Sequence, residues 1–229
     1  MKLYPLLLCA LLAACSSQAP SEKANSAGGK DNKQSSQTSA NQAPSKITPK
    51  GEFAEVDISK SQQAMDAITN GKGETINTIL EAPNDYAPPV LYLISAIMFD
   101  NEYEDQATFW FYVAQLRARS DANKSGDDTA HAAVSQLNQR FGAKITPYSM
   151  SNPERLKAIV SQALEWDGKQ KRNYDARWIA LQSKDVLTES TIDFAPKQKW
   201  AEIDALTRNQ FRQGLEQALA KIKQPASAK

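Results

Sequence analysis

The sequence predicts an all-α fold, either a helical bundle or stacked helical hairpins, preceded by a disordered tether. Three observations support this prediction. Apolar residues recur at spacings of three and four from residue 51 onward, as on the buried face of a helix. Prolines, glycines, serines and Asx residues separate these stretches, at the places where helices begin and end. The only cysteines, Cys9 and Cys15, lie in the first fifteen residues, so no disulfide can hold the rest together.

The first fourteen residues have the pattern of a secretory signal peptide: a charged Lys2, a mostly apolar stretch from Leu3 to Leu12, and two small residues. The sequence Leu-Ala-Ala-Cys at residues 12–15 resembles the lipobox of bacterial lipoproteins. This resemblance implies that the thiol of Cys15 receives a diacylglyceryl group, and that Cys15 becomes the first mature residue with an acylated amine. The alternative is an ordinary signal peptide in which a cysteine falls at this position by chance.

The same resemblance gives an expected location. In bacterial lipoproteins a residue other than Asp after the lipidated cysteine permits export to the outer membrane, and Ser16 stands there. The expected site is therefore the cell envelope, with the protein anchored by lipid, in the outer membrane and facing the periplasm. Several acyl chains would make a firm anchor, because each buried methylene contributes about 0.8 kcal/mol.

Residues 15–50 are expected to be the lipidated cysteine and a disordered tether. The segment is rich in Ser, Ala, Gln, Asn, Lys, Gly and Pro, and its one large apolar residue is Ile47. It cannot bury enough apolar surface to offset the entropy lost on ordering. Residues 51–229 are expected to form the α-helical globular domain. They contain 21 basic and 24 acidic residues, which argues against a nucleic-acid partner, because such proteins present a basic face.

The domain is predicted to begin with two short helices. The first covers residues 59–68, is capped by Ser59 or Ser61 and is closed by Asn-Gly at residues 70–71. The second covers residues 74–80 and is stopped by Pro83.

A helical hairpin from Val90 to Arg119 is predicted at the centre of the domain. The prolines at 88 and 89 suit a first turn, and the apolar run that follows to Phe99 is too short to span a bilayer. Asp-Asn at residues 100–101 ends this helix. Acidic residues at 102, 104 and 105 then begin a second helix, where the helix dipole favours negative charge.

The hairpin resembles one unit of a tetratricopeptide or Sel1-like repeat. Ala107, Phe111 and Ala114 keep the spacing of the second helix of such a unit, and Ala96 and Phe99 suit the first. The sequence departs from the pattern in two ways: the interval between the helices is one residue short, and Ala96 stands where glycine is expected. There is no clean second copy, whereas an array needs about three. The resemblance implies stacked helical hairpins.

The rest of the chain is predicted to be helical with one irregular segment. Asp127 or Asp128 caps a helix that ends at Gly142, and residues 143–150 with Pro147 form a loop. Ser151 or Asn152 caps the next helix, with proline at its first position. The remaining expectations are a short helix at 174–181, an irregular stretch at 183–194 in which residues 186–187 and 191–192 pair as brief strands, and a long helix from Pro196 to Pro225.

The sequence contains no recognisable catalytic or metal-binding set. His131 is the single histidine, so we expect no metal, no cofactor and no enzymatic activity. Carboxylate pairs that could serve glycoside hydrolysis are Glu102 with Asp105 and Glu165 with Asp167, but both pairs fall at polar helix ends, where solvent exposure is the simpler expectation.

Trp, Tyr and Arg are the usual anchors of binding surfaces. The candidate binding residues are therefore Trp110, Tyr112, Arg117, Arg177 and Trp178. The alternative is that the tryptophans are core residues and that the arginines form local salt bridges.

These features together favour a membrane-anchored envelope lipoprotein that acts as a non-catalytic protein-binding module. Its partner would be an unidentified envelope protein, in a scaffold or assembly role, or a toxin, in an immunity-type inhibitor. The alternative is a cell-wall-modifying enzyme or the activator of one.

Overall fold

The computed structural model describes residues 48–188 and 190–223, and these residues are helical, as the sequence predicted. They form seven α-helices and five short 3-10 helices, and no β-strand occurs in this part of the chain. The predicted leader, Cys15 and all but the last three residues of the tether lie outside the described residues. So does Pro225, the predicted end of the last helix.

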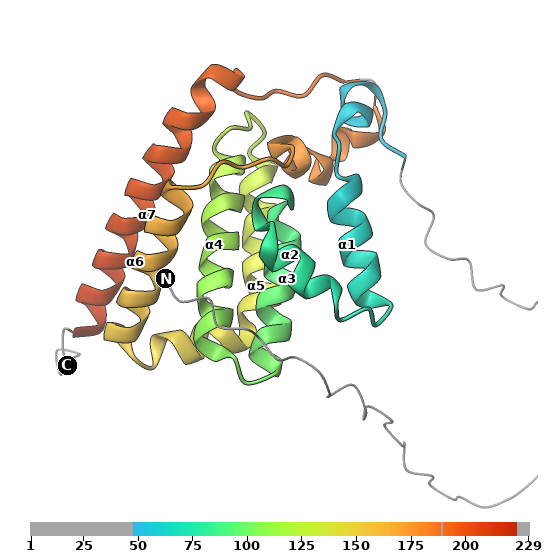
Figure 1. Cartoon of the computed structure of the whole chain (residues 1–229). Helices are drawn as coiled ribbons and strands as arrows, with labels where there is room; N and C mark the ends of the chain where they lie inside the picture. Colours follow the sequence, from blue (N-terminus) through green and yellow to red (C-terminus); the bar gives the residue numbers. More distant parts are fainter. Residues whose placement is uncertain (1–47, 189, 224–229) are drawn as a thin grey trace, which may run out of the picture. The chain divides into compact units, whose positions relative to one another are not determined.

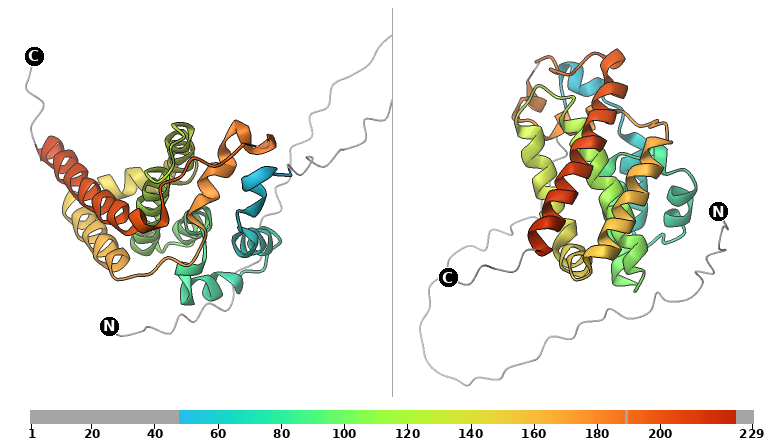
Figure 2. Two further views of the ribbon diagram at one scale, coloured as in Figure 1. Left: turned by 90° about the horizontal axis from the view of Figure 1, so that it is seen from above. Right: turned by 90° about the vertical axis from the view of Figure 1, so that its left-hand side faces the viewer.

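Helix α4 (Glu104–Ala122) is the centre of the domain. It packs against α3 (Pro88–Asp100), α5 (Thr129–Met150), α6 (Pro153–Gly168) and α7 (Trp200–Lys223). Figure 1 shows α3, α4 and α5 side by side, and the view from above in Figure 2 shows α6 and α7 along the other side of α4. Eleven of the nineteen residues of α4 are buried, because neighbouring helices cover most of its circumference.

The predicted hairpin is present with nearly the predicted bounds. The prolines at 88 and 89 start α3, and the chain turns at Glu102, which adopts a left-handed conformation with φ of 66°. Ala107, Phe111 and Ala114, the residues that carry the repeat-like spacing, are all buried in the main core. That core also takes in α3 residues such as Tyr92, whose ring meets the ring of Phe111 edge to face at 5.6 Å.

Two short helices cover one side of the core. They are α1 (Ser59–Thr69) and α2 (Thr75–Glu81), and a 3-10 turn, η2 (Pro83–Asp85), leads from α2 to α3. The end of α1 is as predicted: Asn70 is its C-cap, and Gly71 has a positive φ of 81°, which glycine adopts without strain. The N-cap differs, because the carboxylate of Asp57 accepts hydrogen bonds from both the backbone N–H and the hydroxyl of Ser59.

The prediction that a helix ends at Gly142 and is followed by a loop was wrong. Helix α5 continues through both Gly142 and Pro147 to Met150. Gly142 is buried against α4: a Cβ atom at this position would lie 2.8 Å from Cζ of Phe111. The glycine therefore permits close packing of two helices and does not end one. The N-cap of α6 is as predicted, with the side chain of Asn152 accepting from the backbone N–H of Arg155.

The segment between α6 and α7 contains three 3-10 helices: η3 (Ala176–Gln182), η4 (Lys184–Leu187) and η5 (Lys197–Lys199). The predicted strand pairing of residues 186–187 with 191–192 was wrong, since Val186 and Leu187 belong to η4. The segment is instead held by an isolated antiparallel bridge between Ser125 and Phe194. The helical part of the chain begins with η1 (Gly51–Glu55). Just before it, the backbone N–H of Lys50 donates to the carbonyl of Val186 in η4.

Candidate functional site

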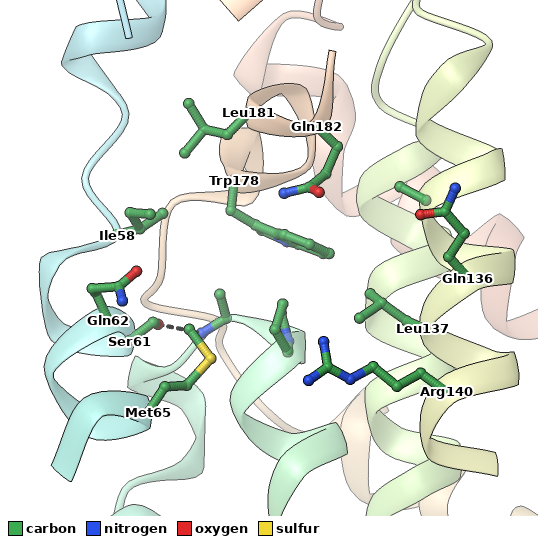
Figure 3. A pocket seen from close by; sticks show the side chains of 13 residues that line it. Ile58, Ser61, Gln62, Met65, Gln136, Leu137, Arg140, Trp178, Leu181 and Gln182 are labelled. Carbon is green, nitrogen blue, oxygen red and sulfur yellow. Dashed lines mark hydrogen bonds between the residues drawn. The ribbon is translucent and has the colours of Figure 1, made fainter. Parts of the chain in front are cut away.

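A groove lies between α1, α5 and η3 (Figure 3). Its volume is about 330 Å³, which is at the lower end of the range for ligand sites. We call it the Trp178 groove, after the indole that lies between its two walls (Figure 3). Its apolar lining includes Ile58 and Met65 from the α1 side, Leu137 from α5 and Leu181 from η3.

The α1 wall is fixed to the start of α3. The backbone N–H of Ala87 donates to Oγ of Ser61 over 2.9 Å, and both residues line the groove (Figure 3). A second contact is the ion pair between Lys60 and Asp85, with 2.6 Å between Nζ and Oδ2. This pair is solvent-exposed, so it contributes at most about 1 kcal/mol, and the buried Ser61 contact is the stronger restraint on α1.

The floor of the groove is fixed from below by a buried carboxylate. Trp178 is 4% exposed, and its Nε1–H donates to Oδ2 of Asp121 over 2.8 Å. The hydroxyl of Tyr174 donates to the same oxygen over 2.9 Å. Because its polar atom is fixed and its ring is packed, the indole is rigid, and the small part of it that remains exposed forms an apolar edge of the groove.

Asp121 belongs to a buried network of charges beneath the groove, at the junction of α4, α6 and α7. We call it the charge network. Its three carboxylates are those of Asp121, Asp167 and Asp204. Its four cations are Arg117, Lys124, Arg172 and Arg208.

The contacts of the charge network satisfy each carboxylate several times. Asp167 accepts from Nε of Arg117 at 2.8 Å, from Nη2 of Arg172 at 2.9 Å and from Nη1 of Arg208 at 3.1 Å. Lys124 joins the other two carboxylates, lying 2.9 Å from Asp121 and 2.8 Å from Asp204. No buried side-chain nitrogen or oxygen in the described part of the chain lacks a partner. The network is therefore a stable arrangement of buried charge, because every desolvated group is paired.

The electrostatics of the network keep the carboxylates of Asp167 and Asp204 ionised. Burial by itself would raise the pKa of Asp167, but Arg172 and Arg117 outweigh that effect and lower the pKa to about 2. The pKa of Asp204 is lowered in the same way, with burial opposed by Arg172 and Lys124. Burial, and then the charge of Asp121, raise the pKa of Tyr174 well above its usual value, so its hydroxyl remains a donor.

A second pocket of about 530 Å³ adjoins the Trp178 groove, and Ile58, Ser61 and Ala87 line both. Its lining is more polar, and two of the carboxylates in it are paired with cations. Lys60 pairs with Asp85, and the carboxylate of Asp175 binds Arg177 at 2.8 Å.

The structure does not bring the five sequence-predicted binding residues into one surface. Trp110 is half-buried in an aromatic cluster, with its ring 5.3 Å from that of Trp166 and 5.2 Å from that of Phe109. Tyr112 is half-buried beside α7, 6.2 Å from the ring of Phe211. Neither residue lines the groove or the second pocket.

The three remaining candidates behave differently from one another. Arg117 is fully buried in the charge network, so it cannot be a surface anchor. Arg177 is partly exposed and pairs with Asp175 two residues before it. Trp178 lines the groove but is a core residue whose indole N–H is already bound. The alternative interpretation, a core tryptophan and an arginine in a local salt bridge, describes Trp178 and Arg177, whereas the salt bridge of Arg117 is to a residue fifty positions away.

In the carboxylate pairs considered for glycoside hydrolysis, three of the four side chains are bound to other residues. Glu165 is exposed and pairs with Lys169, whereas Asp167 is buried in the charge network. Glu102 is exposed at the α3–α4 turn, and Asp105 binds the hydroxyl of Tyr148 and the guanidinium of Arg155. His131 is an exposed residue of α5. No group of three or more His, Cys, Asp or Glu residues within the described ranges is arranged to hold a metal ion.

Sequence reasoning missed Asp121, Arg140 and most of the charge network. One signal was available: Val113, Arg117 and Asp121 recur at intervals of four, so two charged residues continue a buried face of α4. Charges on such a face are rarely buried unless they are paired, which predicts partners on neighbouring helices. The sequence carries no signal for the distant partners of Arg117 and Asp121, because these lie in α6 at Asp167 and in the loop at Arg172.

No helix in the part of the chain that the structure describes is long and apolar enough to cross a membrane. Comparisons with protein-family models, with curated proteins and with solved structures find no match to this chain.

Proposed function

We propose that this protein is a lipid-anchored lipoprotein of a bacterial envelope whose helical domain binds another protein and catalyses no reaction. The observation that carries the proposal is the sequence Leu-Ala-Ala-Cys at residues 12–15, directly after a charged and apolar leader. A polar tether of about 35 residues would give the domain a reach of roughly 30–35 Å from the membrane surface.

The geometry of the domain supports binding in preference to catalysis. The Trp178 groove combines an apolar lining with a few polar side chains, among them Gln136 and Arg140, which is the usual composition of a recognition site. The carboxylates of Asp121, Asp167 and Asp204 are each engaged by two or more donors, which supports a structural role for them. Whether the partner is an assembly protein or a toxin can be judged from the neighbouring genes, since an adjacent toxin gene favours the immunity role.

Lipidation is tested by growing cells with an alkyne-bearing fatty acid and comparing three forms of the full chain. The unaltered chain and Cys9→Ser should both acquire the label and sediment with membranes, because Cys9 lies inside the removed leader. Cys15→Ser should acquire no label and leave the membrane fraction. Equal labelling of Cys15→Ser and the unaltered chain would overturn the lipid anchor, as would an unlabelled chain with its leader intact.

Protein binding is tested by mild chemical crosslinking of intact cells, followed by purification of the lipidated chain. The expected result is a stoichiometric adduct of constant mass that disappears when the domain is unfolded before crosslinking. Absence of any adduct over a range of crosslinker lengths would count against the binding role and leave the lipid anchor untouched.

A further inference from the structure

The charged side chain that lines the Trp178 groove indicates which charge a bound partner must carry. Among the described residues that line it, Arg140 bears the single charge. Its guanidinium extends from α5 across one end of the groove toward α1 (Figure 3). The contact found for it within the described ranges is with the ring of its neighbour Phe141, 5.2 Å away, and no carboxylate there pairs with it.

The wall that carries Arg140 is free of opposing charge. Residues 129–150, the whole of α5, contain no Asp or Glu. The acidic residue of α1, Asp66, does not line the groove and accepts a hydrogen bond from Gln62. The groove is therefore locally positive, although the domain as a whole has a slight excess of acidic residues. A carboxylate entering it would meet an arginine with unused donors, which is the strongest simple anion recognition that a side chain offers.

Two amides extend the set of unused donors and acceptors. Gln136 on α5 and Gln182 on η3 are exposed, line the groove, and make no side-chain hydrogen bond with the described residues. Amides in this position can pair with the backbone N–H and C=O groups of a bound chain. Trp178 and Leu137 lie beside these amides in the groove (Figure 3), where a large side chain of that bound chain would be desolvated.

We propose that the Trp178 groove binds an extended segment of a partner protein in which a large apolar side chain stands close to a carboxylate, with the apolar group on Trp178 and the carboxylate on Arg140. The carboxylate belongs to Asp, Glu or a chain terminus. This inference rests on the proposed protein-binding function and names the chemistry of its partner.

The first experiment selects binders from a displayed library of random twelve-residue peptides, using the full mature chain in detergent. The expected binders carry Asp or Glu within about three positions of Leu, Ile, Phe or Trp. Arg140→Gln should weaken them by roughly fivefold or more. Lys144→Gln should change binding by less than about twofold. Lys144 lies one turn further along α5, outside the groove, and pairs with Asp100. Its replacement by Gln therefore removes the same charge as Arg140→Gln without changing the groove.

Charge reversal makes the test specific to Arg140. Selection against Arg140→Glu should replace the acidic residues of the binders with Lys or Arg while keeping the apolar position. Binders without acidic enrichment, or an unchanged preference after charge reversal, would overturn the proposal. The proposal would also be overturned if the selection gave no binders, or if the groove bound a fatty acid and no peptide. Arg140 is exposed on α5, so none of these variants removes a core contact.

A second experiment separates failure of this proposal from failure of the binding function. A photo-crosslinking amino acid is placed at Gln136 in the groove or at Gln213, an exposed position on α7. An adduct from Gln136 in cells should be lost with Arg140→Glu and kept with Lys144→Gln, and sequencing should place it beside an acidic residue. Adducts from Gln213 alone would overturn the groove assignment but leave protein binding in place, whereas no adduct from either position would overturn both.

Discussion

Arg117 and Asp167 are fifty positions apart in the chain and form an ion pair with 2.8 Å between Nε and Oδ1, with both side chains fully buried. The same guanidinium donates to the carbonyl of Pro83 and to the amide oxygen of Asn84. One side chain on α4 therefore fixes both α6 and the turn before α3.

Replacing Arg117 with methionine should destabilise the domain by about 3–5 kcal/mol, because it leaves Asp167 buried with less compensation. The matched change Lys144→Met breaks an exposed pair with Asp100 and should cost less than about 1 kcal/mol. Urea unfolding followed by circular dichroism gives both values. A loss for Arg117→Met no larger than that for Lys144→Met would show that the network contributes little.

The stability of the domain should fall at acid pH in a way that depends on Asp167. Its pKa is lowered to about 2 in the folded state, against an ordinary value near 3.8. A lowered carboxyl pKa contributes stability that is complete above the unfolded value and is lost as the pH falls from about 4 to about 2. The contribution is roughly 2 kcal/mol. Unfolding free energies at pH 6 and pH 2.5 should therefore differ less in Asp167→Asn than in the unaltered chain, and an identical pH dependence would contradict this account.

The hairpin could be predicted from the sequence because its signals are local. Prolines at 88 and 89, an unbroken apolar run and acidic residues at 104 and 105 each act within one turn of the helix that they define. Gly142 and Pro147 were misread for the opposite reason. Their usual meaning as helix terminators is also local, but Gly142 contacts Phe111, which is 31 positions earlier on another helix.

The candidate site was less accessible to sequence reasoning. Trp178 was identified as an anchor because of its residue type, but its burial depends on Asp121, which is 57 positions away. No local feature of the sequence marks Arg140 as the cation that lines a groove. Residue type alone could suggest the kind of binding, whereas the position of the groove follows from the packing of α1, α5 and η3.

The contact between Trp178 and Asp121 predicts a specific cost for removing a single N–H. Trp178→Phe keeps an aromatic ring in the floor of the groove but takes one donor from a carboxylate that is fully buried. The free energy of unfolding should fall by about 1–3 kcal/mol, from the lost hydrogen bond and from the looser packing around a smaller ring. Trp200→Phe is the control, since its Nε1–H donates to the backbone carbonyl of Ala195 near the surface. Equal losses for the two variants would mean that the buried acceptor has no special importance.

Two glycines in helices should respond in opposite directions to the same change. Gly214 in α7 has open space around it, and a Cβ atom there would meet nothing within 4 Å. Gly214→Ala should therefore stabilise the domain by about 0.5–1 kcal/mol, because alanine loses less backbone entropy in a helix. At Gly142 a Cβ atom would lie 2.8 Å from Cζ of Phe111 and 2.9 Å from Oγ1 of Thr146.

Phe111 cannot easily give way to a methyl group at Gly142. Its ring is 2% exposed and is fixed by edge-to-face contacts with Tyr92 at 5.6 Å and Tyr112 at 5.4 Å. Gly142→Ala should therefore destabilise the domain by about 1–3 kcal/mol despite its better helix propensity. Thermal unfolding of the two single variants and the double variant gives the comparison, and their effects should add because the sites share no partner. A stabilising effect of alanine at Gly142 would mean that α4 and α5 are not closely packed at this point.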